Sequence, residues 1–200
     1  MTAAPERPGL RERKKAGTRA AIRHHALRLF AEQGFDATSV EQIAEAAEVS
    51  DRTVFRYFPT KETLVTVDDY DELIAGSVDR QPAGIGPVTA LREAFREVLG
   101  GLGGGELAAK RERQTLVLSV PSLWAASLPN VTGTRETLTG LVAGRLGKPK
   151  DDPRVRALAG AVFGVMLTVW FDWADDPALD APAALDAALA ELAKGFGEVA

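Results

Sequence analysis

The sequence predicts an all-α protein of about nine helices. Apolar residues recur at helical spacing along most of the 200-residue chain, and no segment shows the alternation of a half-buried β-strand. Prolines, glycines and capping residues divide the chain into segments of helix length. Because 46% of the residues are hydrophobic, the chain has enough apolar surface for a packed core. We expect an N-terminal domain of three helices followed by a larger C-terminal helical bundle.

The charged residues are distributed unevenly along the chain. Of its 24 Lys/Arg and 28 Asp/Glu residues, 11 and 8 lie within residues 1–61, which leaves 13 and 20 for the remainder. A basic N-terminal third on an acidic body indicates that only the first part meets a polyanion.

Cysteine is absent, which excludes disulfides and thiolate metal sites and favours a reducing cytoplasm. The N-terminus lacks the apolar stretch of a signal peptide. The uncharged and mainly apolar run at residues 157–171 has 15 residues, whereas a bilayer span needs about 20. We therefore expect a cytoplasmic protein in which this run is a buried helix, with no membrane partner.

The first 17 residues contain two prolines, two glycines and a basic run at 11–15, without apolar periodicity. We expect a flexible basic arm. It is either a solvated tail or a segment whose charges reach phosphates or the minor groove of DNA.

Thr18 is a suitable N-cap for a helix that runs to about Gln33 and stops at Gly34. The adjacent His24 and His25 suggest a metal site. However, neighbouring side chains on a helix point about 100° apart, and no carboxylate or cysteine lies at ligand spacing. We favour a structural role for both histidines and expect no metal and no cofactor. The apolar stripe of this helix is Ile22, Ala26, Leu29 and Phe30.

Residues 39–61 predict two short helices joined by a tight turn. Ser39, with Gln42 three residues later, forms a capping box for the first helix, and Ser50 can cap the second. Val54 and Phe58 carry the inner face of the second helix. Such a helix, polar and basic outside and braced by a preceding helix, is typical of a helix-turn-helix that enters the DNA major groove. Its outward residues are Asp51, Arg52, Thr53, Arg56 and Tyr57.

After Pro59, Thr60 can cap a helix that runs to about Val78 and links the two halves of the chain. Residues 81–87, rich in proline and glycine, read as a connection. The further helices are expected at about 88–102, at 106–120, at 122–147 with interruptions at Pro129 and Gly133, at 153–174, and from Pro182 onward.

From Thr18 to Val65 the chain resembles the tetracycline-repressor (TetR) family of bacterial transcription regulators. The resemblance is carried by the run ALRLFAEQGFDATSVEQIA and by the pattern VS..TVFRYFPTKE..L. The recognition helix and the basic leader are similar to those of actinobacterial members, some of which answer to long-chain acyl-CoA or other hydrophobic ligands. The resemblance implies an all-helical homodimer, with a DNA-binding domain at 18–64 and a ligand-binding and dimerisation domain at 65–200.

The resemblance also implies roles for single residues. In relatives, the positions of Tyr57 and Lys61 contact phosphates, and Ser39 matches a region that touches phosphate. Arg52 is either a bidentate partner of guanine, worth about 1–3 kcal/mol of discrimination, or a phosphate contact without sequence preference. The positions of Asp51, Arg52 and Thr53 approach base edges in relatives, and Ser50 and Arg56 complete the expected DNA-binding set.

Three residues depart from the family pattern. Glu48 stands at the turn position usually filled by glycine, so it is expected to adopt a positive φ at a cost of about 1 kcal/mol. Phe55 stands where tyrosine is common, so a phosphate-bonding hydroxyl is missing. Asp51 stands where lysine is common, and phosphates repel it unless it accepts from cytosine or pairs with Arg52.

Large apolar residues of the C-terminal half are either core residues or the lining of a ligand cavity between bundle helices. Arg111 and Arg113 are either solvated or placed to receive an anionic headgroup. The candidate lining residues are Phe95, Leu99, Leu116, Trp124, Leu128, Phe163, Met166 and Trp170.

Dimerisation is assigned to the last two helices. Gly160 and Gly164, four residues apart, permit close helix approach, and two copies of the helix pair form a four-helix interface. Its two-fold axis presents both recognition helices to a palindrome. The second expected stripe is Leu185, Leu189, Leu192 and Phe196.

The leading hypothesis is a homodimeric repressor that binds a double-stranded DNA operator and is released by a small hydrophobic effector. The first alternative is a DNA-binding dimer with no effector. The second is an enzyme, for which His24 and His25 are the most concentrated candidate groups.

Overall fold

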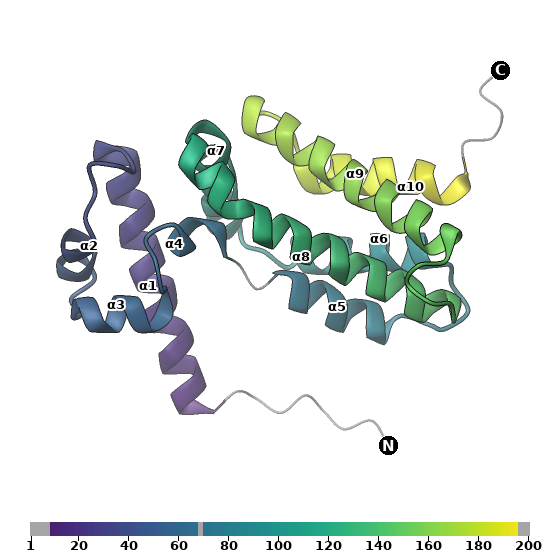
Figure 1. Cartoon of the computed structure of the whole chain (residues 1–200), viewed down its shortest axis with the longest axis horizontal. Coiled ribbons are helices and arrows are strands. Elements are labelled where there is room, and N and C mark those ends of the chain that lie inside the picture. Colours follow the sequence, from purple (N-terminus) through teal and green to yellow (C-terminus); the bar gives the residue numbers. More distant parts are fainter. Residues whose placement is uncertain (1–8, 68–69, 196–200) are drawn as a thin grey trace. The chain divides into compact units, whose positions relative to one another are not determined.

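The computed structural model describes residues 9–67 and 70–195, and this part of the chain is helical without strands (Figure 1). It divides into two compact units, residues 1–65 and 66–200. The N-terminal unit holds α1 (Leu10–Gln33), α2 (Val40–Ala46), α3 (Asp51–Tyr57) and α4 (Thr63–Thr66, ending one residue into the second unit). The C-terminal unit holds α5 (Tyr70–Arg80), α6 (Pro87–Gly100), α7 (Gly104–Ser119), α8 (Pro121–Leu146), α9 (Pro153–Asp175) and α10 (Ala181–Lys194).

The first helix begins eight residues before the expected start at Thr18. Residues 10–17 continue α1, which corrects the flexible arm for this part, while residues 1–8 lie outside the described chain. The segment has no apolar stripe, but its Arg, Lys, Glu and Ala residues are strong helix formers. Thr18 does not cap the helix, because its hydroxyl lies inside α1 and donates to the carbonyl of Lys14 (3.0 Å).

The link between the two units contains two helices rather than the single expected helix from Thr60 to Val78. α4 has one turn, and α5 begins at Tyr70. Val65, Thr66 and Val67 are consecutive β-branched residues, whose side chains lose rotamer freedom in a helix, and this disfavours an uninterrupted one.

α8 runs unbroken through both expected interruptions. Pro129 has no N–H for the carbonyl of Ala125, but both residues are exposed, so water can satisfy that carbonyl. Gly133 continues the helix. The expected breaks at Pro129 and Gly133 are therefore wrong.

The core of the C-terminal unit is shared by α5, α6, α8, α9 and α10. Arg145 of α8 donates to the carbonyls of Val78, Gln81 and Pro82, which satisfies the C-terminal end of α5. Arg92 of α6 forms a two-pronged ion pair with Asp186 of α10 (2.8 and 2.7 Å). The hydrogen bonds from Arg92 lower the pKa of the Asp186 carboxyl. These contacts tie helices distant in sequence into one bundle.

Among the described residues, α9 alone is long and apolar enough to cross a membrane by length and composition. Only 28% of its most apolar window is buried. Its other side is exposed, as at Gly160, Gly164 and Phe171. Its core-facing residues recur every three or four positions: Val155, Ala159, Val162, Met166, Val169 and Trp173.

Candidate nucleic-acid interface

The orientation of α3 is set by two buried side chains. Val54 and Phe58 are each 1% exposed. The guanidinium groups of Arg19 and Arg23 on α1 lie 5.7 and 5.3 Å from the centre of the Phe58 ring. Because residues four apart share one helix face, these anchors fix which side of α3 points outward.

The outward side of α3 is polar, basic and partly aromatic. Asp51, Arg52 and Arg56 are exposed, as expected, whereas Thr53 and Tyr57 are half-buried. The guanidinium carbon of Arg56 lies 5.1 Å from the centre of the Tyr57 ring, which holds the cation beside the helix.

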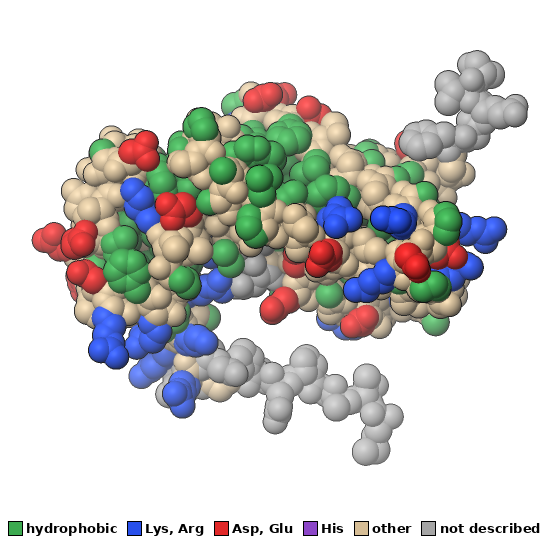
Figure 2. All heavy atoms as spheres, viewed as in Figure 1, with side chains coloured by type: hydrophobic (Ala, Val, Ile, Leu, Met, Phe, Trp, Pro, Cys, Tyr) green, Lys and Arg blue, Asp and Glu red, His purple; other side chains and the backbone are tan. Residues whose placement is uncertain are grey.

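Basic residues extend this surface beyond α3. Figure 2 shows most of the Lys and Arg side chains that are visible on the N-terminal unit gathered beside α3 and along the first half of α1, whereas acidic side chains lie around α2. On α1 the exposed cations include Arg11, Lys14 and Lys15. The first turns of α1 therefore carry the basic residues that were expected on an irregular arm.

Both expected caps are present in the helix-turn-helix. Ser39 Oγ accepts from the Gln42 N–H (3.3 Å), and Gln42 Oε1 accepts from the Ser39 N–H (2.9 Å), which completes the capping box. Ser50 Oγ accepts from the Thr53 N–H (3.2 Å) and lies 3.0 Å from the Thr53 hydroxyl. Ser39 and Ser50 therefore have a structural task whether or not they also contact DNA.

The turn between α2 and α3 adopts the strained conformation that the sequence predicts. Glu48 has a φ of 52°, and it is the non-glycine residue with positive φ in the described chain. The turn is closed by the Val49 N–H, which donates to the carbonyl of Ala44 (2.9 Å).

Lys61 is half-buried against the N-terminal unit. Its Nζ donates to the carbonyls of Phe35 (2.9 Å) and Thr38 (3.0 Å) and lies 4.2 Å from the centre of the Phe35 ring. Two of the three donors of the ammonium group are thus used to hold the loop between α1 and α2. Lys61 therefore has a structural task, and the phosphate contact expected of it stays a prediction.

The two histidines, His24 and His25, lie beside each other on α1. His24 is exposed and His25 half-buried, with ring centres 5.5 Å apart in an edge-to-face arrangement. Within the described residues, no group of three or more His, Cys, Asp or Glu side chains is placed to hold a metal ion.

The candidate pocket residues do not share one environment. Phe95 and Met166 are buried in the core, with Leu99, Phe163 and Trp170 packed against it. Leu116 and Trp124 are half-buried. Leu128 is exposed, so its assignment to an enclosed lining is wrong.

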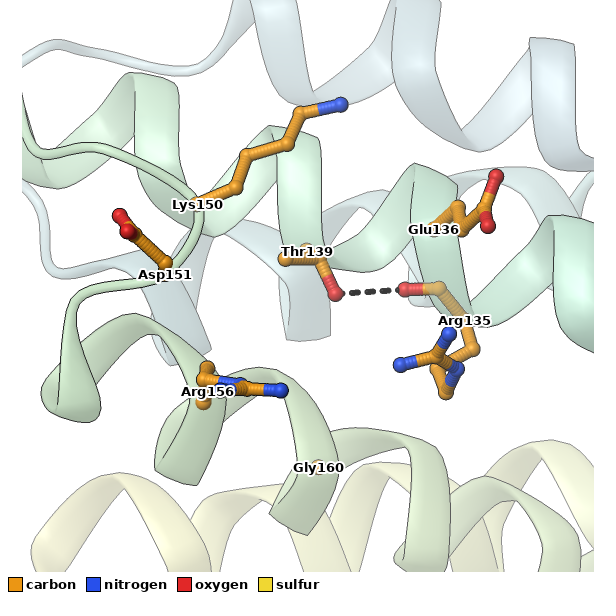
Figure 3. A pocket seen from close by; sticks show the side chains of 7 residues that line it. All are labelled: Arg135, Glu136, Thr139, Lys150, Asp151, Arg156 and Gly160. Carbon is orange, nitrogen blue, oxygen red and sulfur yellow. Dashed lines mark hydrogen bonds between the residues drawn. The ribbon is translucent and has the colours of Figure 1, made fainter.

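An open groove lies elsewhere in this unit, between α8 and α9. Its volume is about 420 Å³, and its lining is mostly charged (Figure 3). Thr139 Oγ1 donates to the carbonyl of Arg135 (2.7 Å) on one wall. The predicted pocket residues do not line this groove. Its lining residues are Arg135, Glu136, Thr139, Lys150, Asp151, Arg156 and Gly160.

The cations of α7 face the protein interior. Lys110 and Arg113 are 9% and 8% exposed. Lys110 Nζ lies 3.6 Å from the centre of the Tyr70 ring and 5.4 Å from that of Trp170. Arg111 Nε donates to the carbonyl of Trp173 (3.0 Å). Arg111 and Arg113 are therefore not simply solvated, and sequence reasoning missed Lys110 because its aromatic partners lie on other helices.

The expected dimer residues fall into two groups. Gly160 and Gly164 lie on the exposed side of α9. Leu185 and Leu189 lie fully buried in the core of their own subunit, so their assignment to an intersubunit surface is wrong. Leu192 is half-buried against the same core, and Phe196 lies outside the described residues.

A helix-turn-helix with a basic outward face, joined to a helical bundle, defines the class of DNA-binding transcription regulators. The family model described as "MftR C-terminal domain" matches residues 85–197. The model described as "Bacterial regulatory proteins, tetR family" matches residues 22–66. The chain belongs to the TetR family of transcriptional regulators.

Named relatives agree with this assignment. The regulator TcmR of Streptomyces glaucescens is 38% identical over 94% of this chain and 88% of its own length. The putative mycofactocin biosynthesis transcriptional regulator MftR of Mycobacterium tuberculosis is 31% identical over 92% of this chain and 93% of its own length. The crystal structure of Thermus thermophilus FadR, a TetR-family repressor in complex with lauroyl-CoA, has a TM-score of 0.54. It is 27% identical and covers 90% of this chain and 95% of that chain. The expected resemblance to actinobacterial members is confirmed.

Replacing Lys61 by methionine should lower the free energy of unfolding of the N-terminal unit by about 2 kcal/mol, because two charge-assisted hydrogen bonds to carbonyls are lost. Arg52→Met removes a cation from an exposed position and should change stability by less than about 0.5 kcal/mol. Urea denaturation followed by circular dichroism measures both. Equal midpoints for the two variants would show that the Lys61 contacts contribute nothing.

Proposed function

We propose that the protein is a homodimeric repressor that binds a palindromic operator in the cytoplasm and leaves it when a small hydrophobic effector binds. The observation that carries the proposal is the outward face of α3. It presents Arg52 and Arg56 beside the basic first turns of α1 on an otherwise acidic chain. Phosphate attraction to such a face gives affinity, and base edges in the major groove give sequence preference.

The DNA contacts divide into reading and anchoring residues. Arg52 lies in the first turn of α3, where the N-terminal residues of a recognition helix approach base edges. Its guanidinium can donate two hydrogen bonds to guanine. Arg56 lies in the last turn, and its position beside the Tyr57 ring suits both residues to a phosphate contact. Lys14 and Lys15 add charge along the same unit.

A second copy of the chain fits the outer side of α9. Gly160, Gly164 and Phe171 are exposed there, and no side chain lies within 4 Å of a Cβ built on either glycine. Figure 2 shows hydrophobic side chains gathered over α8 and the C-terminal half of α9. On α10, the exposed Ala183 and Ala187 replace the buried leucines as the candidate contact surface. Small residues allow the close helix approach of a four-helix interface.

The effector response is proposed to pass through Thr66, Tyr70 and Asp71, near the start of the C-terminal unit. Each of these three residues contacts another helix of that unit. Asn130 Nδ2 donates to the carbonyl of Thr66 (3.0 Å), Thr134 Oγ1 donates to Asp71 Oδ2 (2.7 Å), and Lys110 Nζ stacks on the Tyr70 ring. An effector that displaces α7 or α8 would therefore displace Thr66, Tyr70 and Asp71, which follow the recognition helix in the chain. The effector can weaken DNA binding only as far as it binds the DNA-free conformation more tightly than the DNA-bound conformation.

The DNA-binding proposal is tested by fluorescence anisotropy with a duplex that the protein itself selects from random DNA. We expect a dissociation constant in the nanomolar range and a strong loss of affinity with salt. Arg52→Met should alter the base preference at one position per half-site. Arg56→Met should weaken all duplexes alike and lower the salt slope by about one per contact. If both variants weaken all sequences equally, the division into reading and anchoring residues is wrong.

The dimer proposal is tested by placing a charge on the outer side of α9. Gly164→Glu should convert the dimer to a monomer in sedimentation velocity, because a carboxylate in an apolar interface lacks a partner. Gly144→Glu is the matched control, since Gly144 is also an exposed helical glycine with open space around its Cβ. A dimer that persists in Gly164→Glu places the interface elsewhere.

The coupling proposal is tested by adding lauroyl-CoA, the ligand bound to FadR, to the complex with the selected duplex. We expect release of DNA from the wild type and a weaker release from Thr134→Val, which loses the contact with Asp71. Thr139→Val on the same helix is the control, because the Thr139 hydroxyl bonds only the carbonyl of Arg135 in its own helix. Binding of lauroyl-CoA is followed by tryptophan fluorescence. Unchanged DNA affinity in the wild type would favour a dimer without this class of effector.

A further inference from the structure

Phe55 is a large apolar side chain displayed on the recognition helix. The Phe55 side chain is 48% exposed. Of its two neighbours in the sequence, Val54 is buried and Arg56 lies beside the Tyr57 ring. Since the anchors Val54 and Phe58 fix the rotation of the helix, Phe55 cannot turn toward the core. Asp51 and Arg52, four and three residues earlier, lie on the same face.

The surroundings of the ring restrict what can cover it. On α3 the exposed cations Arg52 and Arg56 outnumber the one exposed carboxylate, Asp51, and residues 1–61 hold 11 Lys/Arg against 8 Asp/Glu. The complementary surface is therefore a polyanion. Phenylalanine has no hydrogen-bonding group for a phosphate. Among the base edges of the DNA major groove, the apolar group is the C5-methyl of thymine.

We propose that Phe55 is a specificity-determining residue that packs its ring against the C5-methyl of a thymine in each half-site. The inference rests on the proposed DNA-binding function. Arg52 lies three residues earlier, which is about 4.5 Å along the helix axis and a little more than one base-pair step. The thymine is therefore expected within one or two base pairs of the base that Arg52 contacts.

The test removes the methyl group and nothing else. Each thymine of the selected duplex is replaced in turn by deoxyuridine, symmetrically in both half-sites, and affinity is measured by fluorescence anisotropy. For the wild type we expect one position at which the replacement weakens binding by about fourfold per half-site, the factor that follows from one buried methyl-sized group. At other thymines the affinity should stay unchanged.

The ring is then removed in the same assay. Phe55→Ala should bind the thymine duplex more weakly and should show no further loss with deoxyuridine at that position. Phe55→Leu, which keeps an apolar side chain, should retain part of the preference for thymine. Arg52→Met is the matched control on the same face, and it should keep the full deoxyuridine effect. Circular dichroism melting checks that the variants remain folded, as expected for an exposed side chain.

Three outcomes would overturn the inference. The first is equal wild-type affinity for every deoxyuridine duplex, as for a ring that remains in solvent or contacts a protein. The second is an undiminished deoxyuridine effect in Phe55→Ala, which would mean that another residue reads the methyl. The third, a wild-type protein that binds no duplex specifically, would refute the proposed function itself and the inference with it.

Discussion

The burial of Val54 and Phe58 is the constraint on which the DNA-facing surface depends. α3 has seven residues, and an isolated helix of that length is unstable in water. It persists because two side chains, four residues apart, are buried in the N-terminal unit. The same burial forces Arg52 and Phe55 outward. Two buried residues thus decide which residues of α3 face outward.

The capping and turn residues supply the remaining order in this small unit. Glu48 adopts a positive φ, which costs about 1 kcal/mol in a residue with a Cβ. The caps of the two flanking helices offset this cost, because Ser39 and Ser50 satisfy free N–H groups at the starts of α2 and α3. Lys61 ties the loop before α2 to the segment after α3. Strain at one residue is therefore tolerated because the contacts on both sides define the turn.

Features governed by neighbouring residues in sequence were predictable, and those governed by distant residues were not. The caps at Ser39 and Ser50 follow from local chemistry, and the positive φ of Glu48 follows from the resemblance to the TetR family, in which glycine usually fills this turn position. The partners of Lys61 lie 23 and 26 residues away, so no local pattern reveals them. Hydrophobic periodicity predicted that Leu185 lies on the apolar face of its helix. It did not predict whether that face is buried in the same subunit or against a second copy of the chain. The early start of α1 was missed because a charged helix has no apolar stripe.

The C-terminal unit shows why apolar composition alone does not specify an environment. α9 has the length and composition of a membrane span, yet its largest side chains, such as Met166 and Trp173, point into a protein core at helical spacing. Its other side carries Gly160 and Gly164 together with the exposed Phe171. Small residues gain little from hydrocarbon but let another helix approach closely. The two glycines on the exposed side of α9 therefore leave room for a second helix at close range, which is the basis of the proposed interface.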